Sequence, residues 1–229
     1  MNPDRVEVSA KADRACLISP ASPIPSNYPR FKLGVMASGS GSNFEAIAQS
    51  IQDGRLNADI QTVIYNNPTA KVVDRAKRFN VPSVLIDHRE FETREDLDRA
   101  IVQTMQQFSV EWIIMAGWMR IVTPVLIDAF PNRILNVHPS LLPSFKGNRA
   151  VERALKAGVK ITGCTVHLVV PEVDSGEIIV QAAVPVLNGD TVETLQNRIH
   201  LQEHCIYPQA IALAASKAIC DEERHLSKG

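Results

Sequence analysis

The chain has 229 residues, enough for one α/β domain with a sizeable core. Its 24 Lys and Arg residues nearly balance 25 Asp and Glu residues, so the charge gives no reason to expect nucleic acid or an anionic membrane as a partner. The four cysteines form no CxxC pair, which argues against a zinc site or a disulfide framework and indicates a reducing, cytoplasmic location. No apolar run is long enough to span a bilayer.

Residues 1–30 differ in composition from the rest of the chain. The stretch 18–29 is rich in Pro and Ser and has no hydrophobic period, which predicts a flexible N-terminal extension. A transit peptide is the sharper alternative, but acidic residues such as Asp4 and Glu7 count against it. We expect residues 31–229 to form a single domain.

From Phe31 onward, strand and helix patterns alternate. Apolar, β-branched runs predict strands at residues 32–38, 58–65, 83–87, 112–117 and 134–138. Helical patterns lie between them, beginning near Asn43, Val72, Thr93 and Thr123. This rhythm predicts an α/β fold with a doubly wound, Rossmann-like, mostly parallel sheet. Ligands bind such sheets at the carboxyl ends of the strands, so the loops there should form one functional rim.

After the fifth strand the pattern changes. A helix is predicted at residues 150–157, followed by β-rich runs at residues 163–170 and 177–186 with only a short link between them. That spacing favours an antiparallel C-terminal strand pair. The last long helix is expected to start at Asp190, with Glu193 closing a capping box.

Asn136 and His138 end the fifth strand, which Pro139 prevents from continuing. Two residues apart on an extended strand, their side chains point to the same face. The amide can donate to a developing oxyanion and the imidazole can handle a proton, which suits chemistry on a carbonyl. The alternative is a pair of satisfied core polar groups, and on these two residues alone that alternative is favoured.

Asp174 lies in the link between the two late strands, in an Asp-Ser-Gly sequence that is common in plain turns. Together with Asn136 and His138 it completes a set of carboxylate, imidazole and amide. A carboxylate close to an imidazole raises the ring's pKa above its ordinary value of about 6.5. No Ser or Cys in these motifs is an obvious activated nucleophile, so direct attack of one substrate on another is favoured over a covalent enzyme intermediate.

Residues 38–43, Ser-Gly-Ser-Gly-Ser-Asn, connect the first strand to the first helix. Small residues and a helix N-terminus favour phosphate binding over a plain tight turn. The loop is not a P-loop, because no Gly-Lys-Ser/Thr comes after it, and Phe44 occupies the third glycine position of a dinucleotide fingerprint. Glu203 lies on the apolar stripe of the last helix, where it either binds a polar ligand or joins a structural ion pair.

These motifs, from about Phe31 to about Ala215, resemble the folate-dependent formyltransferases. The segments 136–143 and 163–179 carry the resemblance. The loop 39–43 and the segment 202–208 make the chain most similar to the branch that formylates glycinamide ribonucleotide in de novo purine biosynthesis. The resemblance implies transfer of a formyl group from 10-formyltetrahydrofolate to the amine of 5-phosphoribosylglycinamide, without metal or ATP, by a monomer or weak homodimer.

The resemblance also implies roles for individual residues. The catalytic residues would be Asn136, His138 and Asp174. The phosphate and ribonucleotide would be bound by Gly41, Ser42, Asn43 and Glu203. The folate would be bound by Arg94, Met119, Arg120, Ile121, Val122 and Asn136. Residues 148–151 depart from the family, which often has a histidine-containing segment there, so Arg149 either contacts the folate carboxylates or is plain surface.

Three alternative functions remain. A formyltetrahydrofolate deformylase would share the three catalytic residues but is expected to carry an N-terminal regulatory domain and has little use for a phosphate loop. Methionyl-tRNA formyltransferase is expected to carry a basic C-terminal RNA-binding domain. A non-catalytic nucleotide- or folate-binding module would not need the complete catalytic set.

Overall fold

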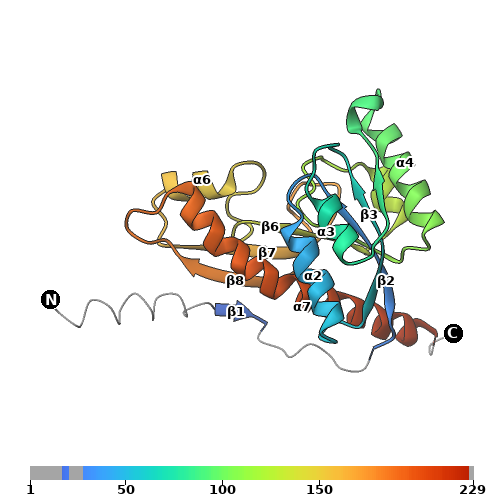
Figure 1. The fold of residues 1–229 in the computed structure, drawn as a ribbon. Helices are drawn as coiled ribbons and strands as arrows, with labels where there is room; N and C mark the ends of the chain where they lie inside the picture. Colours follow the sequence, from blue (N-terminus) through green and yellow to red (C-terminus); the bar gives the residue numbers. More distant parts are fainter. Residues whose placement is uncertain (1–16, 21–27, 227–229) are drawn as a thin grey trace.

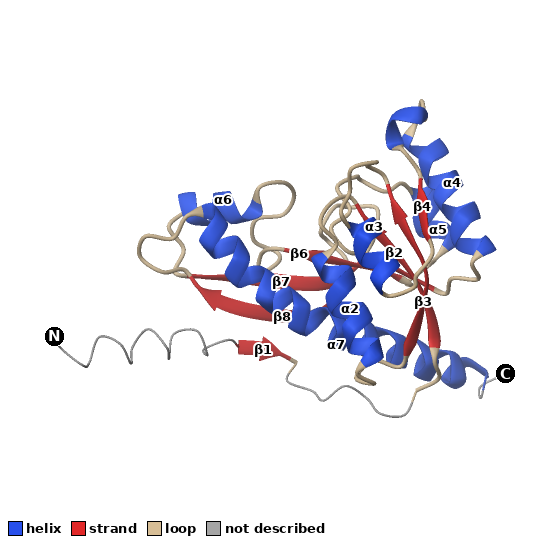
Figure 2. Ribbon diagram, viewed as in Figure 1, coloured by secondary structure: helices blue, strands red, loops and turns tan. Residues whose placement is uncertain are grey.

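The structure, a computed structural model, describes residues 17–20 and 28–226. They form an eight-stranded sheet with the strand order β1-β8-β7-β6-β5-β2-β3-β4, flanked by helices (Figures 1 and 2). The strands are β1 Leu17–Ser19, β2 Phe31–Ala37, β3 Ala58–Tyr65, β4 Ser83–Leu85, β5 Trp112–Met115, β6 Ile134–His138, β7 Ile161–Leu168 and β8 Ile178–Pro185. The α-helices are α2 Ser42–Gln52, α3 Val72–Arg78, α4 Arg94–Gln107, α5 Pro124–Ala129, α6 Ala150–Lys156 and α7 Val192–Leu226.

The sheet has a parallel and an antiparallel part. Strands β6, β5, β2, β3 and β4 pair in parallel with one another, whereas β7 is antiparallel to β6 and β8 is antiparallel to β7. The predicted doubly wound, mostly parallel sheet with an antiparallel C-terminal pair is therefore confirmed. The antiparallel pair continues the same sheet, so β6 lies between the two parts.

The alternation of side chains along β2 explains why helices cover both faces of the sheet. Leu33 and Val35 belong to a core that also contains apolar residues of α2, α3 and α7. Met36, which points to the other face, belongs to a second core with residues of α4 and α5. A strand segment that is buried on both faces must be apolar, which is how β5 and residues 33–37 of β2 read in the sequence.

Strand β1 corrects part of the prediction for the N-terminus. Leu17–Ser19, which the sequence places in a flexible extension, pairs antiparallel with β8, and Gln209 Nε2 donates to the Pro20 carbonyl at 3.0 Å. Tyr28 is also held, because its hydroxyl accepts from the Asn57 N–H at 3.0 Å. Residues 1–16 and 21–27 of the predicted extension lie outside the described residues.

Two helix starts test the capping predictions. Thr93 caps α4 as expected, accepting from the Asp96 N–H at 3.1 Å. The expected capping box of Asp190 and Glu193 is wrong. Thr191 precedes α7 and accepts from the Thr194 N–H at 3.2 Å, while the Thr194 hydroxyl accepts from the Thr191 N–H at 2.9 Å.

No helix in the described part of the chain is long and apolar enough to cross a membrane. The 35-residue helix α7 continues through Pro208 and packs along β7 and β8, with further contacts to α2 and α6 (Figure 1).

Candidate active site

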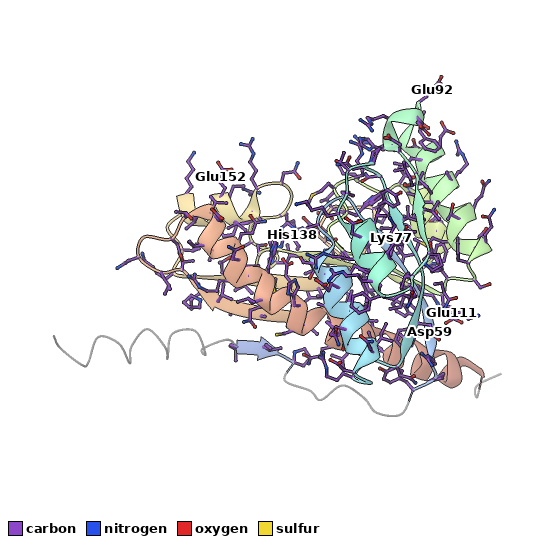
Figure 3. All side chains as sticks on the ribbon, in the orientation of Figure 1. Asp59, Lys77, Glu92, Glu111, His138 and Glu152 are labelled. Atoms are coloured by element: carbon purple, nitrogen blue, oxygen red, sulfur yellow. The ribbon has the colours of Figure 1, made fainter. Side chains whose placement is uncertain are left out.

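Strand β6 carries Asn136 and His138 to the carboxyl end of the parallel strands. Both residues line a cavity of about 650 Å³. The His138 residue is only 7% exposed. In Figure 3, His138 lies among the central elements, whereas Glu92 and Glu152 lie at the periphery. The predicted rim thus has a buried imidazole facing a cavity large enough for a small-molecule ligand.

The Asp174 carboxylate lies beside His138, with 3.2 Å between Asp174 Oδ2 and His138 Nδ1. The Gly147 N–H donates to the same carboxylate oxygen at 2.7 Å. Burial would raise the pKa of Asp174, but hydrogen bonds from His167 and Gly147 and the charges of His138 and His167 outweigh it, so the pKa lies below its ordinary value. The carboxylate is therefore held ionised against the ring.

The second ring nitrogen of His138 also has a partner. Its Nε2 lies 2.9 Å from the Phe145 carbonyl oxygen. Both nitrogens thus face acceptors, and a ring that donates to both carries a proton on each. Donation to a ligand oxygen requires Nε2 to exchange the Phe145 carbonyl for that oxygen.

His167, on β7, belongs to this cluster, although no sequence motif predicted it. It is paired in register with Asn136, and its Nε2 lies 3.2 Å from Asn136 Nδ2 and 3.5 Å from Asp174 Oδ1. Its Nδ1 lies 2.8 Å from the Leu168 carbonyl oxygen. In the neutral ring with its proton on Nδ1, Nε2 can accept from the Asn136 amide and set its orientation, whereas a ring protonated on both nitrogens faces Asp174 with its Nε2–H. The available signal was a histidine in an apolar strand, shortly before Asp174.

The residues predicted to bind folate line the same cavity as Asn136, His138 and Asp174. They come from the first turn of α4 and the loop after β5: Arg94, Met119, Arg120, Ile121 and Val122. The apolar side chains of Met119 and Ile121 are 78% and 52% exposed. Exposed apolar side chains next to guanidinium groups suit a flat ring system with an anionic tail. Arg149 also lines the cavity, near Glu152.

The glycine-rich loop is tightly built. Gly41 has a φ of 75° and precedes α2. A Cβ on Gly41 would lie 2.5 Å from Val72 Cγ2, so only glycine fits. The Arg75 side chain donates to the Ser40 carbonyl at 2.8 Å. The first N–H groups of α2, at Ser42 and Asn43, have no partner within the helix and can receive an anion.

Glu203 and Asn43 form a second buried cluster beside this loop. Asn43 Nδ2 donates to Glu203 Oε2 at 2.9 Å, and Glu203 is only 3% exposed. Burial raises the pKa of Glu203, against the hydrogen bond from Asn43 and the charges of His200 and His138. The buried Asn43 Oδ1 has no hydrogen-bond partner among the described residues, so a ligand donor would satisfy it.

The predicted site residues therefore form two groups. The residues predicted to act in catalysis and to bind folate share the 650 Å³ cavity, whereas Gly41, Ser42, Asn43 and Glu203 do not line it. The His138 charge nevertheless acts on Glu203, so the two groups lie within electrostatic range of one another. Within residues 17–20 and 28–226, no group of three or more His, Cys, Asp or Glu side chains could hold a metal ion.

Comparison with known proteins places this chain in a family. Residues 31–211 match the family described as formyl transferase. The phosphoribosylglycinamide formyltransferase of Bacillus subtilis is 41% identical over 180 residues, covering 79% of this chain and 92% of that protein. The crystal structure of glycinamide ribonucleotide transformylase 1 from Symbiobacterium toebii is 44% identical with a TM-score of 0.81, covering 86% of this chain and 94% of that chain.

A longer relative also matches. The Homo sapiens trifunctional purine biosynthetic protein adenosine-3 is 43% identical over 188 residues, which are 82% of this chain. The chain spans only 19% of that protein's length, so only one part of the relative is compared. On the family match and the similarity to the Bacillus subtilis enzyme over nearly its whole length, the chain belongs to the formyl transferase family.

Proposed function

We propose that the chain is a phosphoribosylglycinamide formyltransferase, which transfers the formyl group of 10-formyltetrahydrofolate to the amine of 5-phosphoribosylglycinamide in de novo purine biosynthesis. The observation that carries this proposal is the buried cluster of Asn136, His138 and Asp174 lining a ligand-sized cavity. The activities for which the Bacillus subtilis and Symbiobacterium toebii relatives are named support the same reaction.

The proposed reaction is a direct transfer. The amine nitrogen attacks the formyl carbon, and a tetrahedral intermediate forms with negative charge on its oxygen. Asn136 Nδ2 and the Nε2–H of His138 donate to that oxygen, once Nε2 leaves the Phe145 carbonyl. The bond between the formyl carbon and N10 then breaks. The amine loses one proton and N10 gains one, with a water held by Asp174 as the carrier.

The ionised Asp174 supports this scheme electrostatically. Its negative charge stabilises a protonated His138, which in turn stabilises the oxyanion. The scheme needs no metal and no ATP, because the formyl group is already activated on the folate nitrogen. Binding the amine and the formyl carbon in one site supplies the remaining rate enhancement through proximity.

The glycine-rich loop favours transfer over hydrolysis. A deformylase uses water as its second substrate and has no phosphate to bind. Here, the N-terminus of α2 with Gly41 offers an anion site, and the buried Asn43 and Glu203 offer hydrogen-bonding groups for a ribose or an amide. We assign these residues to the ribonucleotide, and Arg94 with Met119–Val122 to the folate.

The test supplies purified protein with 10-formyltetrahydrofolate, with and without glycinamide ribonucleotide, and follows formation of tetrahydrofolate. Transfer predicts product only when the ribonucleotide is present, with one formylated ribonucleotide per folate. Equal product without the ribonucleotide would instead establish a deformylase. No product in either case, despite folate binding, would establish a binding module.

A further inference from the structure

Ser38 joins two segments that the proposed function assigns to different substrates. It comes directly after β2 and begins the phosphate loop. Its N–H donates to the Gly117 carbonyl at 3.0 Å, and its hydroxyl oxygen accepts from the Met119 N–H at 2.9 Å. One residue of the ribonucleotide loop is thus bonded twice to the segment after β5, which carries the predicted folate-binding residues.

The folate-binding segment has few other restraints at this point. Trp118, before it, is buried, and Thr123, after it, donates its N–H to Asp98 Oδ2 at 2.6 Å. Between them, the side chains of Met119 and Ile121 are exposed. In the part of the chain that the structure describes, the bond to Ser38 is the only hydrogen bond made by the backbone of residues 119–121. The Ser38 hydroxyl therefore sets the position of Met119.

The phosphate loop itself is held firmly from its other side. The Val72 N–H donates to the Gly39 carbonyl at 3.2 Å, and the Arg75 side chain donates to the Ser40 carbonyl at 2.8 Å. Gly41 packs so closely on Val72 that no side chain fits between them. The loop is consequently a fixed platform, and the folate-binding segment is the part whose position depends on the link.

We propose that the Ser38 hydroxyl is a positioning group that couples the two substrate sites. By holding Met119 against the ribonucleotide loop, it sets the separation between the amine and the formyl carbon, on which the rate of transfer depends steeply. Binding of ribonucleotide to the fixed loop then stabilises the link to Met119, and binding of folate to the other segment stabilises the same link, so each substrate favours the other. This inference rests on the proposed function.

The variant Ser38→Ala removes the acceptor but keeps the bond from its N–H to Gly117. Because Met119 is an exposed residue, its freed N–H can form a hydrogen bond with water, and the fold should persist. We expect kcat to fall, because the reacting atoms are less well placed, and the KM for 10-formyltetrahydrofolate to rise, each by about tenfold, which corresponds to the free energy of one hydrogen bond. The KM for glycinamide ribonucleotide should change less. We also expect the tightening of tetrahydrofolate binding by the ribonucleotide, measured by fluorescence titration, to be lost.

Two control variants sharpen the test. Ser38→Thr keeps a hydroxyl and should restore the coupling. Ser216→Ala removes the hydroxyl bond to the Ala212 carbonyl, 2.7 Å long and in α7, and should leave both KM values unchanged. Wild-type KM values and coupling in Ser38→Ala would overturn the inference while leaving the function intact. A lower Tm with equal rises in both KM values would also overturn it, since that result indicates a structural role only. A wild-type protein without transferase activity would instead remove the proposed function itself.

Discussion

Asp174 Oδ2 lies 3.2 Å from His138 Nδ1, and the backbone brings them together from the loop after β7 and the end of β6. His138 ends β6, and Asp174 comes after β7 in the left-handed conformation, with a φ of 52°. A non-glycine residue in that conformation is uncommon and is retained where the surroundings determine it. The loop after β7 is therefore shaped to place a carboxylate beside a strand-end imidazole.

Asp174→Asn is expected to lower kcat by about 10²- to 10⁴-fold, the usual range for a proton-transfer group. The amide keeps the shape of the side chain but cannot hold a negative charge against His138. Steady-state kinetics of formyl transfer measure the loss. Glu177→Gln, which removes an equal charge from an exposed ion pair with Lys217, should retain wild-type kcat. Equal kcat in both variants would remove Asp174 from the mechanism.

The same substitution should alter the pH dependence of stability. Because the pKa of Asp174 is lowered in the folded protein, its ionised form favours folding above the ordinary value of 3.8, and this contribution is lost as pH falls through the lowered pKa. The wild-type advantage over Asp174→Asn in free energy of unfolding should therefore shrink on acidification. Denaturant titrations at roughly pH 6 and pH 3 measure it, and a constant difference would contradict the prediction.

His167→Asn tests whether the ring orients the Asn136 amide. Loss of the 3.2 Å contact should reduce kcat about tenfold, the value of one hydrogen bond, with little change in either KM. Asn136→Ala alone should cost more. If His167 acts through Asn136, the double variant should be little worse than Asn136→Ala, because the two effects are not additive. Independent, multiplicative losses would show that His167 acts by another route.

Glu203→Gln should separate stability from function. Burial raises the pKa of Glu203, so the folded protein keeps this carboxyl group protonated up to a higher pH than the unfolded chain does. The resulting stabilisation is fully present below the ordinary value of 4.5 and is lost as pH rises through the raised pKa. The variant should therefore unfold at a higher Tm than wild type at neutral and alkaline pH, with no difference in strong acid.

The same Glu203→Gln variant should bind its ribonucleotide substrate more weakly. A neutral amide is a weaker acceptor than a carboxylate, so the KM for glycinamide ribonucleotide should rise by about tenfold or more. Thermal unfolding across pH and steady-state kinetics measure the two effects. Glu193→Gln, an exposed change near the start of the same helix, serves as the control and should change neither Tm nor KM. A fall in Tm at alkaline pH would contradict the assignment.

Lys146 is predicted to support Asp174 from the neighbouring loop. Its ammonium group donates to Ser175 Oγ at 2.6 Å, while the next residue, Gly147, donates its N–H to Asp174. Lys146→Met keeps most of the apolar stem but releases this tie between the loops. We expect kcat to fall about threefold to tenfold, the value of one hydrogen bond. Lys156→Met, an exposed change in α6, is the matched control, and indistinguishable kinetics of the two variants would exclude the role.

The parallel part of the fold was predictable because its signals are local. Strand β5 and residues 33–37 of β2 are buried on both faces and so read as continuous apolar runs. Strand β1 has no such signal. Its three residues are ordered by pairing with Gln181, Ala182 and Ala183, which lie far away in the sequence. Local strand propensity cannot predict pairing with residues so distant in the sequence.

The start of α7 shows how two local signals compete. Asp190 and Glu193 have the spacing of a capping box, but the Asp190 carboxylate is bound by the Arg198 guanidinium at 2.8 Å. That interaction holds the pKa of Asp190 at about 2 and leaves the cap to the next residue, Thr191. The competitor comes from two turns further along the helix, so the four-residue motif could not reveal it.

The site was predictable where residues share a short motif and not where they meet only in space. Asn136 and His138 could be paired from their spacing, but the contact of His167 depends on the antiparallel register of β6 and β7. The short link after β7 predicts that β7 pairs with β8, but it does not predict that β7 also pairs with β6. Because the pairing of β6 with β7 could not be predicted, the position of His167 opposite Asn136 could not be predicted either.

Strand β1 also affects how copies of the molecule meet. It covers part of the outer edge of β8, so the sheet ends in a three-residue strand on that side and in the three-residue strand β4 on the other. Such short ends offer few unpaired backbone groups as a template for another chain. The backbone groups that β1 and β4 occupy, at residues 181–183 of β8 and 63–65 of β3, are thereby closed to strand-by-strand association with another copy.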